Sequence, residues 1–347
     1  MKPCQLVSII SRDGHHREYA KALLAILPGA LAPSQRSSRD IVTAFARRRS
    51  LLFMSIETHP LAFVFSALLG FILRVPVAGL LFRPLEALDN IGWKHRIKNR
   101  LLRGLRYLPN TAVLTILPYA VEPRFATVAV GWIYDIQLWD LAVLAAGSPG
   151  GLPPLSSRIR EAAAGRRVIA AIGAQNYRKG FPYLGQLWME NAALRERFLV
   201  VAAGKVEDEC GASAEAFVAA GGMLVDRRID DDEMFALYRG ADLIWACYPP
   251  TFNLASGIFG RAFQLGVPVI VRDGSFAAEL GRAVGHPSLE LPFDAAEAAG
   301  QRIVEWVPPA IDAARTRVEM QAMMDWTCQV LDDVLAGRRP ATKRQDP

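Results

Sequence analysis

Residues 168–184 read VIAAIGAQNYRKGFPYL, and this stretch decides the fold class. Its first five residues, Val168–Ile172, are all apolar, which predicts a buried strand. Gly173 begins a polar loop, and a helical pattern follows it. A second apolar run, Phe198–Ala202, comes next, so the segment predicts a strand–helix–strand unit of a parallel sheet.

The same alternation continues toward the C-terminus. Further strands are predicted at Met223–Val225, Leu243–Ala246 and Val267–Val271. Helices are predicted between the strands, at about 181–190, 212–219, 231–238 and 257–265. Together these elements predict an α/β domain over residues 166–319, with a parallel sheet and helices on both faces.

The first half of the chain predicts a second domain of this kind, over residues 1–146. Its strands are expected at Leu6–Ile10, Leu51–Ile56, Val75–Phe82 and Ala112–Ile116, with a helix from Arg17 to about Leu27. The run GSPGGLPP at 147–154 has no periodicity, which places an interdomain linker over 147–165. Residues 338–347 lose the apolar pattern and are expected to be a disordered tail.

Length and composition exclude several classes of protein. The 347 residues suffice for two domains, and 52% of them are hydrophobic. The four cysteines are scattered, which argues against a disulfide framework or a zinc site and fits a reducing cytoplasm. The N-terminus lacks the pattern of a signal peptide. The apolar run Leu61–Leu73 is shorter than the roughly 20 residues of a membrane span, so we expect a buried helix there.

Positive charge is concentrated in one segment, within a formal net charge of +6. The basic residues Lys94, Arg96, Lys98, Arg100, Arg103 and Arg106 have no acid between them. Ile97, Leu101, Leu105 and Leu108 recur among them at helical spacing. A basic amphipathic helix over 94–108 suits an anionic membrane surface, and a solvated basic face over a domain core is the alternative. No nucleic-acid-binding motif is present, and none of the spacings indicates a GxGxxG dinucleotide site.

Three segments of the second half resemble the donor-binding domain of GT-B glycosyltransferases, most closely glycosyltransferase family 4 (group 1). They are VIAAIGAQNYRKGFPYL at 168–184, DDEMFALYRGADLIWACYPP at 231–250 and ASGIFGRAFQLGVPVIVRDGS at 255–275. The likeness covers roughly residues 165–335. It implies two Rossmann-like domains facing a cleft, with a C-terminal helix at 320–337 that returns to the first domain.

The resemblance implies a donor site on this half. The phosphate-binding lysine of the family corresponds to Lys179, with Arg178 beside it, and both would neutralise the diphosphate leaving group. Ser256 is expected to cap a helix whose first residues, Gly257 and Ile258, offer free N–H groups to an anion. Gly173 lies on the same donor-binding loop as Lys179.

Two departures from the family pattern put donor recognition in doubt. The family carries two glutamates eight positions apart, and Asn253 and Arg261 occupy those positions here. Asn253 retains hydrogen-bonding capacity for a sugar, whereas a guanidinium cannot accept a bond from a ribose diol. Ala174 stands where the family has an arginine. Donor recognition is therefore altered, or catalysis has been lost.

The remaining candidate residues have structural alternatives. The loop around Arg227 is a candidate contact for the nucleotide base, by analogy with the family alone. The acids Asp230, Asp231, Asp232 and Glu233 precede a helix, and we interpret them as helix caps rather than as a catalytic cluster. The acceptor-side candidates at the ends of the predicted strands are Gly14, His15, His16, Glu57, His59 and Arg83.

These inferences converge on a hexosyltransferase. It would transfer a sugar from a nucleotide-sugar donor to a hydroxyl acceptor, a lipid-linked or polysaccharide precursor, with retention at the anomeric carbon. No metal and no cofactor are expected. The expected location is the cytoplasm, with peripheral attachment to the inner membrane as an open alternative. The competing hypothesis is a catalytically degenerate GT-B protein that binds or scaffolds a partner.

Overall fold

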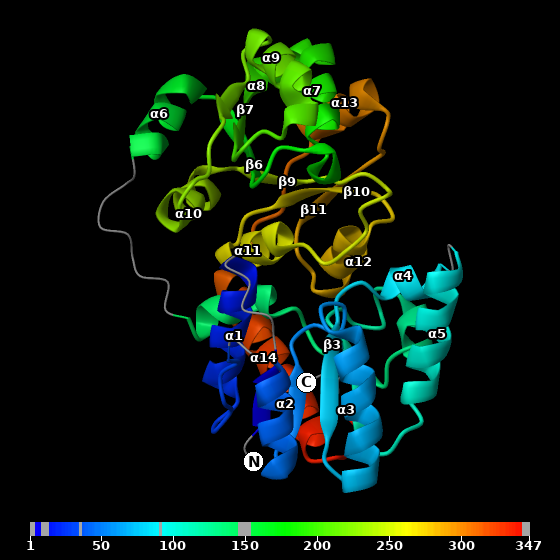
Figure 1. The fold of residues 1–347 in the computed structure, drawn as a ribbon. Coiled ribbons are helices and arrows are strands. Elements are labelled where there is room, and N and C mark those ends of the chain that lie inside the picture. The colour runs from blue at the N-terminus through cyan, green and yellow to red at the C-terminus, as the bar shows by residue number, and fades with distance from the viewer. Residues whose placement is uncertain (1–3, 8–13, 35–36, 90–91, 145–153, 342–347) are drawn as a thin grey trace. The chain divides into compact units, whose positions relative to one another are not determined.

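The computed structural model describes residues 4–7, 14–34, 37–89, 92–144 and 154–341. The chain divides into two compact units, the first formed by residues 1–145 and 320–347 and the second by residues 146–319. Each unit is built around its own parallel β-sheet (Figure 1). The prediction of a two-domain α/β protein is therefore confirmed.

The sheet of the first unit has five parallel strands in the order β1-β2-β3-β4-β5. Their bounds are β1 (Cys4–Val7), β2 (Ser50–Phe53), β3 (Val77–Leu81), β4 (Thr111–Thr115) and β5 (Gly131–Trp132). Four of these strands were predicted, and residues 8–10 of the first prediction lie outside the described residues. Strand β5 was not predicted.

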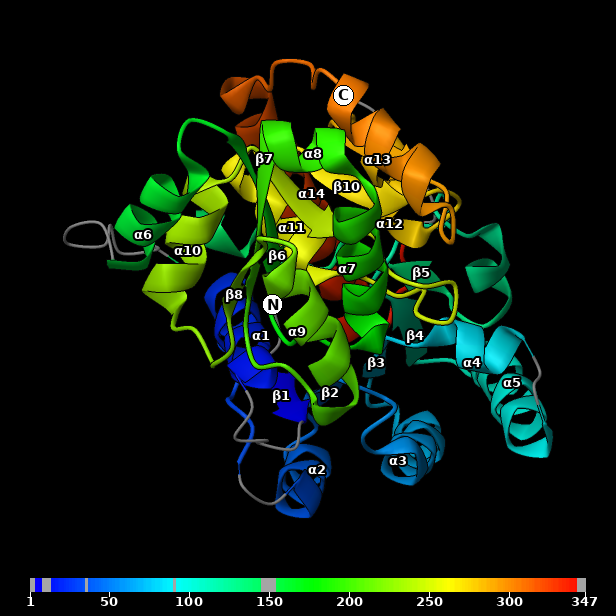
Figure 2. The ribbon, with the colours of Figure 1, turned by 90° about the horizontal axis from the view of Figure 1, so that it is seen from above.

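Helices cover both faces of this sheet. They are α1 (Gly14–Ile26), α2 (Ser37–Ala46), α3 (Pro60–Leu73), α4 (Pro84–Leu88), α5 (Trp93–Leu105) and the end of α14 (Ala313–Leu335). After α1, Leu31 forms an isolated parallel β-bridge with Gln5 at the free edge of β1. Helix α2 then leads the chain back across β1 to β2, which pairs with β1. Because parallel crossovers are right-handed, this reversal places α1 on one face and α2, α3 and α5 on the other (Figure 2).

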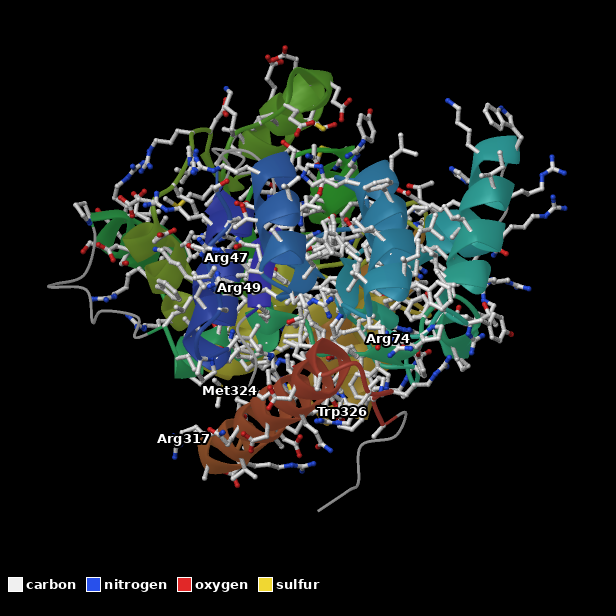
Figure 3. All side chains as sticks on the ribbon, turned by 60° about the horizontal axis from the view of Figure 1, so that its bottom comes forward. Arg47, Arg49, Arg74, Arg317, Met324 and Trp326 are labelled. Carbon is white, nitrogen blue, oxygen red and sulfur yellow. The ribbon has the colours of Figure 1, made fainter. Side chains whose placement is uncertain are left out.

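The C-terminal helix α14 packs against the edge strand of the first unit. The indole N–H of Trp326, labelled in Figure 3, donates to the carbonyl of Trp132 at 3.1 Å. The centroids of the two indole rings are 4.7 Å apart. This contact joins residues 194 positions apart in the chain, so the end of the sequence helps to complete the first unit.

The sheet of the second unit has six parallel strands in the order β11-β10-β9-β6-β7-β8. Their bounds are β6 (Arg167–Ile172), β7 (Phe198–Ala203), β8 (Met223–Val225), β9 (Leu243–Ala246), β10 (Val269–Arg272) and β11 (Ser288–Leu291). From β6 the chain adds strands in one direction, and from β9 it adds them in the other. The order therefore reverses between β6 and β9, which is the Rossmann arrangement.

The helices of the second unit form two layers. They are α6 (Pro154–Ala163), α7 (Phe181–Glu190), α8 (Ala192–Arg197), α9 (Gly211–Ala219), α10 (Asp231–Gly240), α11 (Gly257–Leu265), α12 (Phe276–Ala283) and α13 (Ala296–Glu305). Helices α7, α8, α9 and α13 contact one another on one face, and α6, α10 and α11 do so on the other. Helix α6 occupies part of the segment that was expected to be a linker.

The apolar run Leu61–Leu73 forms helix α3, but the prediction that this helix is buried is wrong. Its buried residues are Phe63, Ser66, Ala67 and Gly70. Its other large side chains are mostly exposed. Within the described ranges, no helix has the length and apolar character to cross a membrane.

Candidate functional site

The loops after β6 and β9 lie at the reversal of strand order in the second unit. In open parallel sheets, ligands bind beyond the carboxyl ends of the strands at such a reversal. The two loops touch backbone to backbone, because a Cβ on Gly180 would lie 2.3 Å from the carbonyl oxygen of Cys247. Gly180 also has a φ of +69°, a conformation that favours glycine. This glycine therefore brings the loop after β6 onto the loop after β9.

Lys179 lies at the centre of this contact. It ends a short 3-10 helix, Tyr177–Lys179, which begins after Asn176. The Asn176 side chain accepts a hydrogen bond from the Lys179 backbone N–H at 2.9 Å. The Lys179 ammonium lies 4.7 Å from the ring centroid of Tyr248 and 5.6 Å from that of Phe252. No carboxylate pairs with it among the described residues, so its charge is held in place without being neutralised.

Tyr248 connects this lysine to the start of helix α11. Its hydroxyl lies 3.1 Å from the Ser256 hydroxyl, and Ser256 accepts a hydrogen bond from the Phe259 N–H at 3.3 Å. Ser256 is therefore the N-cap of α11, as predicted, and Gly257 is the first helical residue. The N-terminus of a helix presents unpaired N–H groups and a partial positive charge. The Lys179 ammonium and this helix end are thus coupled through one tyrosine, an arrangement suited to an anion.

Three residues of this cluster were not predicted from the sequence, namely Tyr248, Phe252 and Arg272. Arg272 ends β10 and donates from its Nε to the Tyr248 carbonyl at 3.1 Å. It thereby adds a second cation to the loop after β9. The available signal was positional, because Tyr248 and Arg272 stand at the carboxyl ends of predicted strands.

The other predicted donor-site residues, Arg178, Gly173 and Ile258, differ in their exposure and in their contacts. Arg178 is exposed and has no side-chain hydrogen bond or ion pair within the part of the chain that the structure describes. Gly173 begins the loop after β6 with a φ of +98°, and its carbonyl oxygen would be 2.0 Å from a Cβ on Gly204. These two glycines bring the ends of β6 and β7 close together. The Ile258 carbonyl accepts a hydrogen bond from the buried Tyr238 at 3.3 Å.

Asn253 and Arg261, which replace the expected glutamates, both have structural contacts. The Asn253 side-chain oxygen accepts a hydrogen bond from the Phe276 N–H at 2.8 Å, which ties the loop to helix α12. Arg261 is buried in α11, with its guanidinium 5.9 Å from the Phe235 ring centroid. Neither side chain therefore reproduces a free carboxylate at the predicted sugar and ribose positions.

Asp230 and Glu233, two of the four acids at the start of helix α10, form a capping box, which confirms the structural interpretation for this pair. Asp230 accepts a hydrogen bond from the Glu233 N–H, and Glu233 reaches back to the Asp230 N–H. Arg227 pairs with Glu233 at 2.6 Å. This guanidinium holds the pKa of Glu233 below its usual value. The Arg227 side chain thus stabilises the start of α10, and its backbone remains the candidate contact for a nucleotide base.

In the first unit, the candidate acceptor residues gather at the carboxyl ends of β2 and β3. Glu57 accepts hydrogen bonds from the Arg83 backbone N–H at 2.7 Å and from the Ser55 hydroxyl at 3.1 Å. His59 precedes α3, and its Nε2 lies 3.4 Å from the Ser37 hydroxyl. Burial lowers the pKa of His59. Glu57 therefore joins two strand ends, which is the loop-tying role considered as the alternative to acceptor binding.

Gly14, His15 and His16 form the first residues of helix α1. Their side chains lie outside the described residues, and so does the loop at 8–13 that precedes them. Their role as acceptor contacts stays a prediction.

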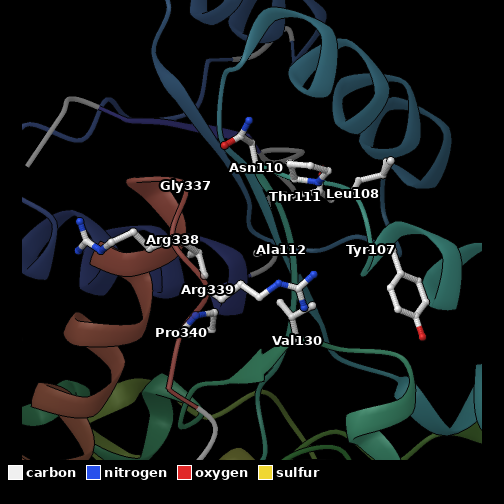
Figure 4. A pocket seen from close by; sticks show the side chains of 12 residues that line it. Tyr107, Leu108, Asn110, Thr111, Ala112, Val130, Gly337, Arg338, Arg339 and Pro340 are labelled. Carbon is white, nitrogen blue, oxygen red and sulfur yellow. The ribbon is translucent and has the colours of Figure 1, made fainter.

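A cavity of about 270 Å³ lies elsewhere in the first unit (Figure 4). Its lining includes Tyr107, Asn110, Thr111, Arg338 and Arg339. Thr111 begins β4, so the cavity lies at the amino ends of the strands, opposite the ends that carry the candidate residues. Within the described part of the chain, no three metal-binding side chains cluster together.

No protein-family model matches the chain, and the curated proteins contain no match to it. Solved structures match it over almost its full length. HepE from Anabaena, in complex with UDP and glucose, is 12% identical with a TM-score of 0.62, covering 97% of this chain and 100% of that chain. Sucrose-phosphate synthase from Thermosynechococcus elongatus is 14% identical with a TM-score of 0.55, covering 97% of both chains.

A third neighbour is the UDP-forming α,α-trehalose-phosphate synthase from Burkholderia vietnamiensis. It is 10% identical with a TM-score of 0.52, covering 97% of this chain and 100% of that chain. These neighbours are glycosyltransferases built from two parallel-sheet domains. The chain therefore has the α/β GT-B fold that these glycosyltransferases share.

Proposed function

We propose that this protein is a glycosyltransferase that moves a hexose from a nucleotide sugar to a hydroxyl acceptor. The observation that carries the proposal is the position of Lys179. Its ammonium lies without a carboxylate partner among the described residues, at the strand-order reversal of a Rossmann sheet and beside a capped helix N-terminus. Cleavage of a nucleotide-sugar bond leaves a diphosphate, whose growing charge requires fixed positive groups nearby.

In this proposal the cations of the second unit neutralise the leaving group. Lys179 contributes a full charge, and the first N–H groups of α11 at Gly257 and Ile258 contribute hydrogen bonds and the positive end of the helix dipole. Arg272, held against the Tyr248 carbonyl, is a further cation for the same phosphates. Retention at the anomeric carbon, without a bound metal, is what the family 4 resemblance supports.

The acceptor is proposed to be a lipid-linked or polysaccharide precursor that binds to the first unit. Glu57, His59 and Arg83 stand at the carboxyl ends of its strands, where ligands of such sheets bind. The basic helix α5 belongs to the same unit and favours an acceptor presented at an anionic surface.

The test of this proposal is the substitution Lys179→Ala, assayed with UDP-glucose as the first donor because two neighbouring structures hold UDP or a UDP-sugar. Removing one group that stabilises transition-state charge typically lowers kcat by about 100-fold or more. Lys21→Ala, at an exposed position on α1, is the matched control and should leave transfer unchanged. If transfer by Lys179→Ala equals that of the wild type, the lysine has no part in the reaction.

A second candidate function is supported by the contacts of Asn253 and Arg261. One uses its side-chain oxygen to hold α12, and the other is buried in α11. A GT-B protein without sugar and ribose carboxylates would serve as a binding or scaffold partner. It would show no turnover with any nucleotide sugar, and it would copurify with a catalytic partner.

A further inference from the structure

Helix α3 has an apolar face that turns away from its own domain. Leu61, Phe65, Leu68 and Ile72 are spaced by four, three and four residues, so they form one stripe on the helix. Their side chains are exposed by 83%, 64%, 49% and 72%. The opposite side of the helix, with Phe63 and Ala67, belongs to the domain core. No charged residue occurs anywhere in α3.

Helix α5 repeats this arrangement with positive charge added. Trp93, Ile97 and Leu101 are spaced by four residues and are exposed by 65%, 55% and 40%. Leu102 and Leu105 are buried on the other side. At 100° per residue, Lys94 flanks the exposed stripe on one side and Arg100 flanks it on the other. The outward face of α5 is therefore a narrow apolar stripe between basic edges.

The charge of this region is left largely uncompensated. Lys98 pairs with Glu86 at 3.0 Å, whereas its basic neighbours on α5 have no acidic partner within the ranges that the structure describes. Those neighbours are Lys94, Arg96, Arg100 and Arg103. From residue 58 to residue 121, the sequence contains only two acids, Glu86 and Asp89. Asp89 is paired with Arg124 at 3.3 Å.

Both helices lie on the same face of the first sheet. Helix α3 packs against β3 and β4, and α5 packs against β4, so they are neighbours over one strand (Figures 1 and 3). Arg47 after α2 and Arg74 after α3, both labelled in Figure 3, add exposed positive charges at the C-terminal ends of these two helices. The exposed stripes of α3 and α5, with the basic residues around them, are called the α3–α5 face below.

We propose that the α3–α5 face binds an anionic lipid membrane. Apolar side chains that enter the acyl boundary and basic residues that contact the headgroups are the two parts of interfacial binding. Trp93 and Tyr107 are both largely exposed at the two ends of α5, and these residue types are enriched at membrane–water interfaces. The inference extends the anionic surface proposed for α5 to α3, and it does not depend on the transfer reaction.

The charge distribution favours lipid over a second copy of this chain. Two copies joined through the α3–α5 face would bring their unpaired lysines and arginines together, and like charges in contact are unfavourable. A protein partner would need an acidic groove that matches the α3–α5 face. An anionic bilayer has negatively charged headgroups above an apolar interior, whatever the area of the face. The first unit therefore carries a surface whose chemistry matches that of a bilayer.

The test is cosedimentation of the full chain with phosphatidylcholine vesicles, with and without phosphatidylglycerol. The wild type should bind the anionic vesicles and bind the neutral ones weakly. Arg96→Gln with Arg100→Gln should lower the partition coefficient about fivefold for each residue. Phe65→Ser with Ile72→Ser should lower it at least about tenfold for each residue.

Two matched control variants lie on the second unit. Arg158→Gln with Arg160→Gln removes the same charge from exposed positions on α6. Val307→Ser with Val318→Ser removes two exposed apolar side chains. Both controls should bind anionic vesicles as the wild type does. All variants should keep the wild-type unfolding temperature, which separates loss of membrane binding from loss of the fold.

Three results would overturn the proposal. The first is failure of the wild type to bind any vesicle, and the second is equal binding to neutral and anionic vesicles. The third is a dimer in light scattering that the Phe65→Ser, Ile72→Ser variant dissociates, because a second copy then covers the α3–α5 face. Binding that requires phosphatidylglycerol and is lost in both α3–α5 variants, but not in the controls, supports it.

Discussion

The Lys179 ammonium is restrained weakly enough to remain available to a ligand. A cation over an aromatic face at a partly exposed site gains about 0.5–1 kcal/mol, and Lys179 lies over Tyr248 and Phe252. A hydrogen bond to a charged group contributes about 1.5–3 kcal/mol. A diphosphate would therefore compete successfully with the rings for the ammonium. In the proposed reaction, the rings would position the lysine between turnovers and release its charge to the anion.

The same site shows which residues can be predicted from the sequence alone and which cannot. Lys179 was identified through the family resemblance and its place on the loop after a predicted strand, and Ser256 because a capping residue precedes a helical pattern. Tyr248 was missed, since its contact with Lys179 joins residues 69 positions apart, which no local pattern reports. The unusual Asn253 and Arg261 were visible in the sequence, but their contacts with Phe276 and Phe235 depend on tertiary packing.

His286 is predicted to make the second unit sensitive to mild acid. Burial lowers its pKa to about 4, and its Nε2 lies 3.0 Å from the Val267 carbonyl. The unfolded chain takes up this proton near pH 6.5, before the folded chain does. The contribution of His286 is therefore complete above about pH 6.5 and is lost as the pH falls toward 4, by about 3 kcal/mol in all.

Urea unfolding at pH 7 and at pH 4.5 measures this loss, with His286→Gln as the comparison because glutamine keeps an N–H donor but does not titrate. The variant should lose less stability than the wild type between the two pH values. Equal losses in both proteins would show that His286 does not control the acid sensitivity.

At the scale of the element, helix α10 offers a test of its cap. Asp230→Ala removes the side-chain half of a capping box and should cost about 1 kcal/mol of unfolding free energy. Asp231→Ala is the control, because Asp231 lies in the first turn but accepts no capping bond. Its loss should be the smaller of the two in urea unfolding. Equal losses would mean that helix-dipole charge, rather than the cap, stabilises α10.

Helix α3 explains why an apolar run does not predict burial. The side that meets the sheet needs small residues, since a Cβ on Gly70 would lie 2.7 Å from both the Val75 carbonyl oxygen and the Val77 side chain. Ser66 and Ala67 are buried beside it. Phe63 is fully buried, but most of the other large side chains are left on the outside. The sequence predicted the helix correctly, but the identity of its inward face depends on how closely it approaches β3.

Short elements were among the other losses, and strand β11 was not predicted either. Strand β5 contains only two residues, Gly131–Trp132, too few to show any alternation. It exists because it pairs with β4 and receives Trp326 from the far end of the chain. Helix α6 follows a segment rich in Gly and Pro, and the turn signals of that segment concealed its start at Pro154.

On the scale of the whole molecule, strand positions were predictable and strand order was not. Apolar runs identified most strands of both sheets, and their alternation with helices implied parallel pairing. The strand order reverses between β6 and β9 because β6 pairs with β7 on one side and with β9 on the other. The sequence does not show which strands pair. That reversal brings Lys179 and Tyr248 together, so the site is a product of topology more than of any motif.

Ligand-dependent thermal unfolding of the purified full chain tests the central claim most directly. The panel would hold UDP, GDP, ADP, CMP and the corresponding nucleotide sugars. A ligand at about 100 times its Kd should stabilise the protein by about 2.7 kcal/mol. We predict stabilisation by nucleotides of one base, with the diphosphate acting more strongly than the monophosphate because Lys179 and the α11 N-terminus bind phosphate. No stabilisation by any nucleotide would contradict a donor site and favour the scaffold function.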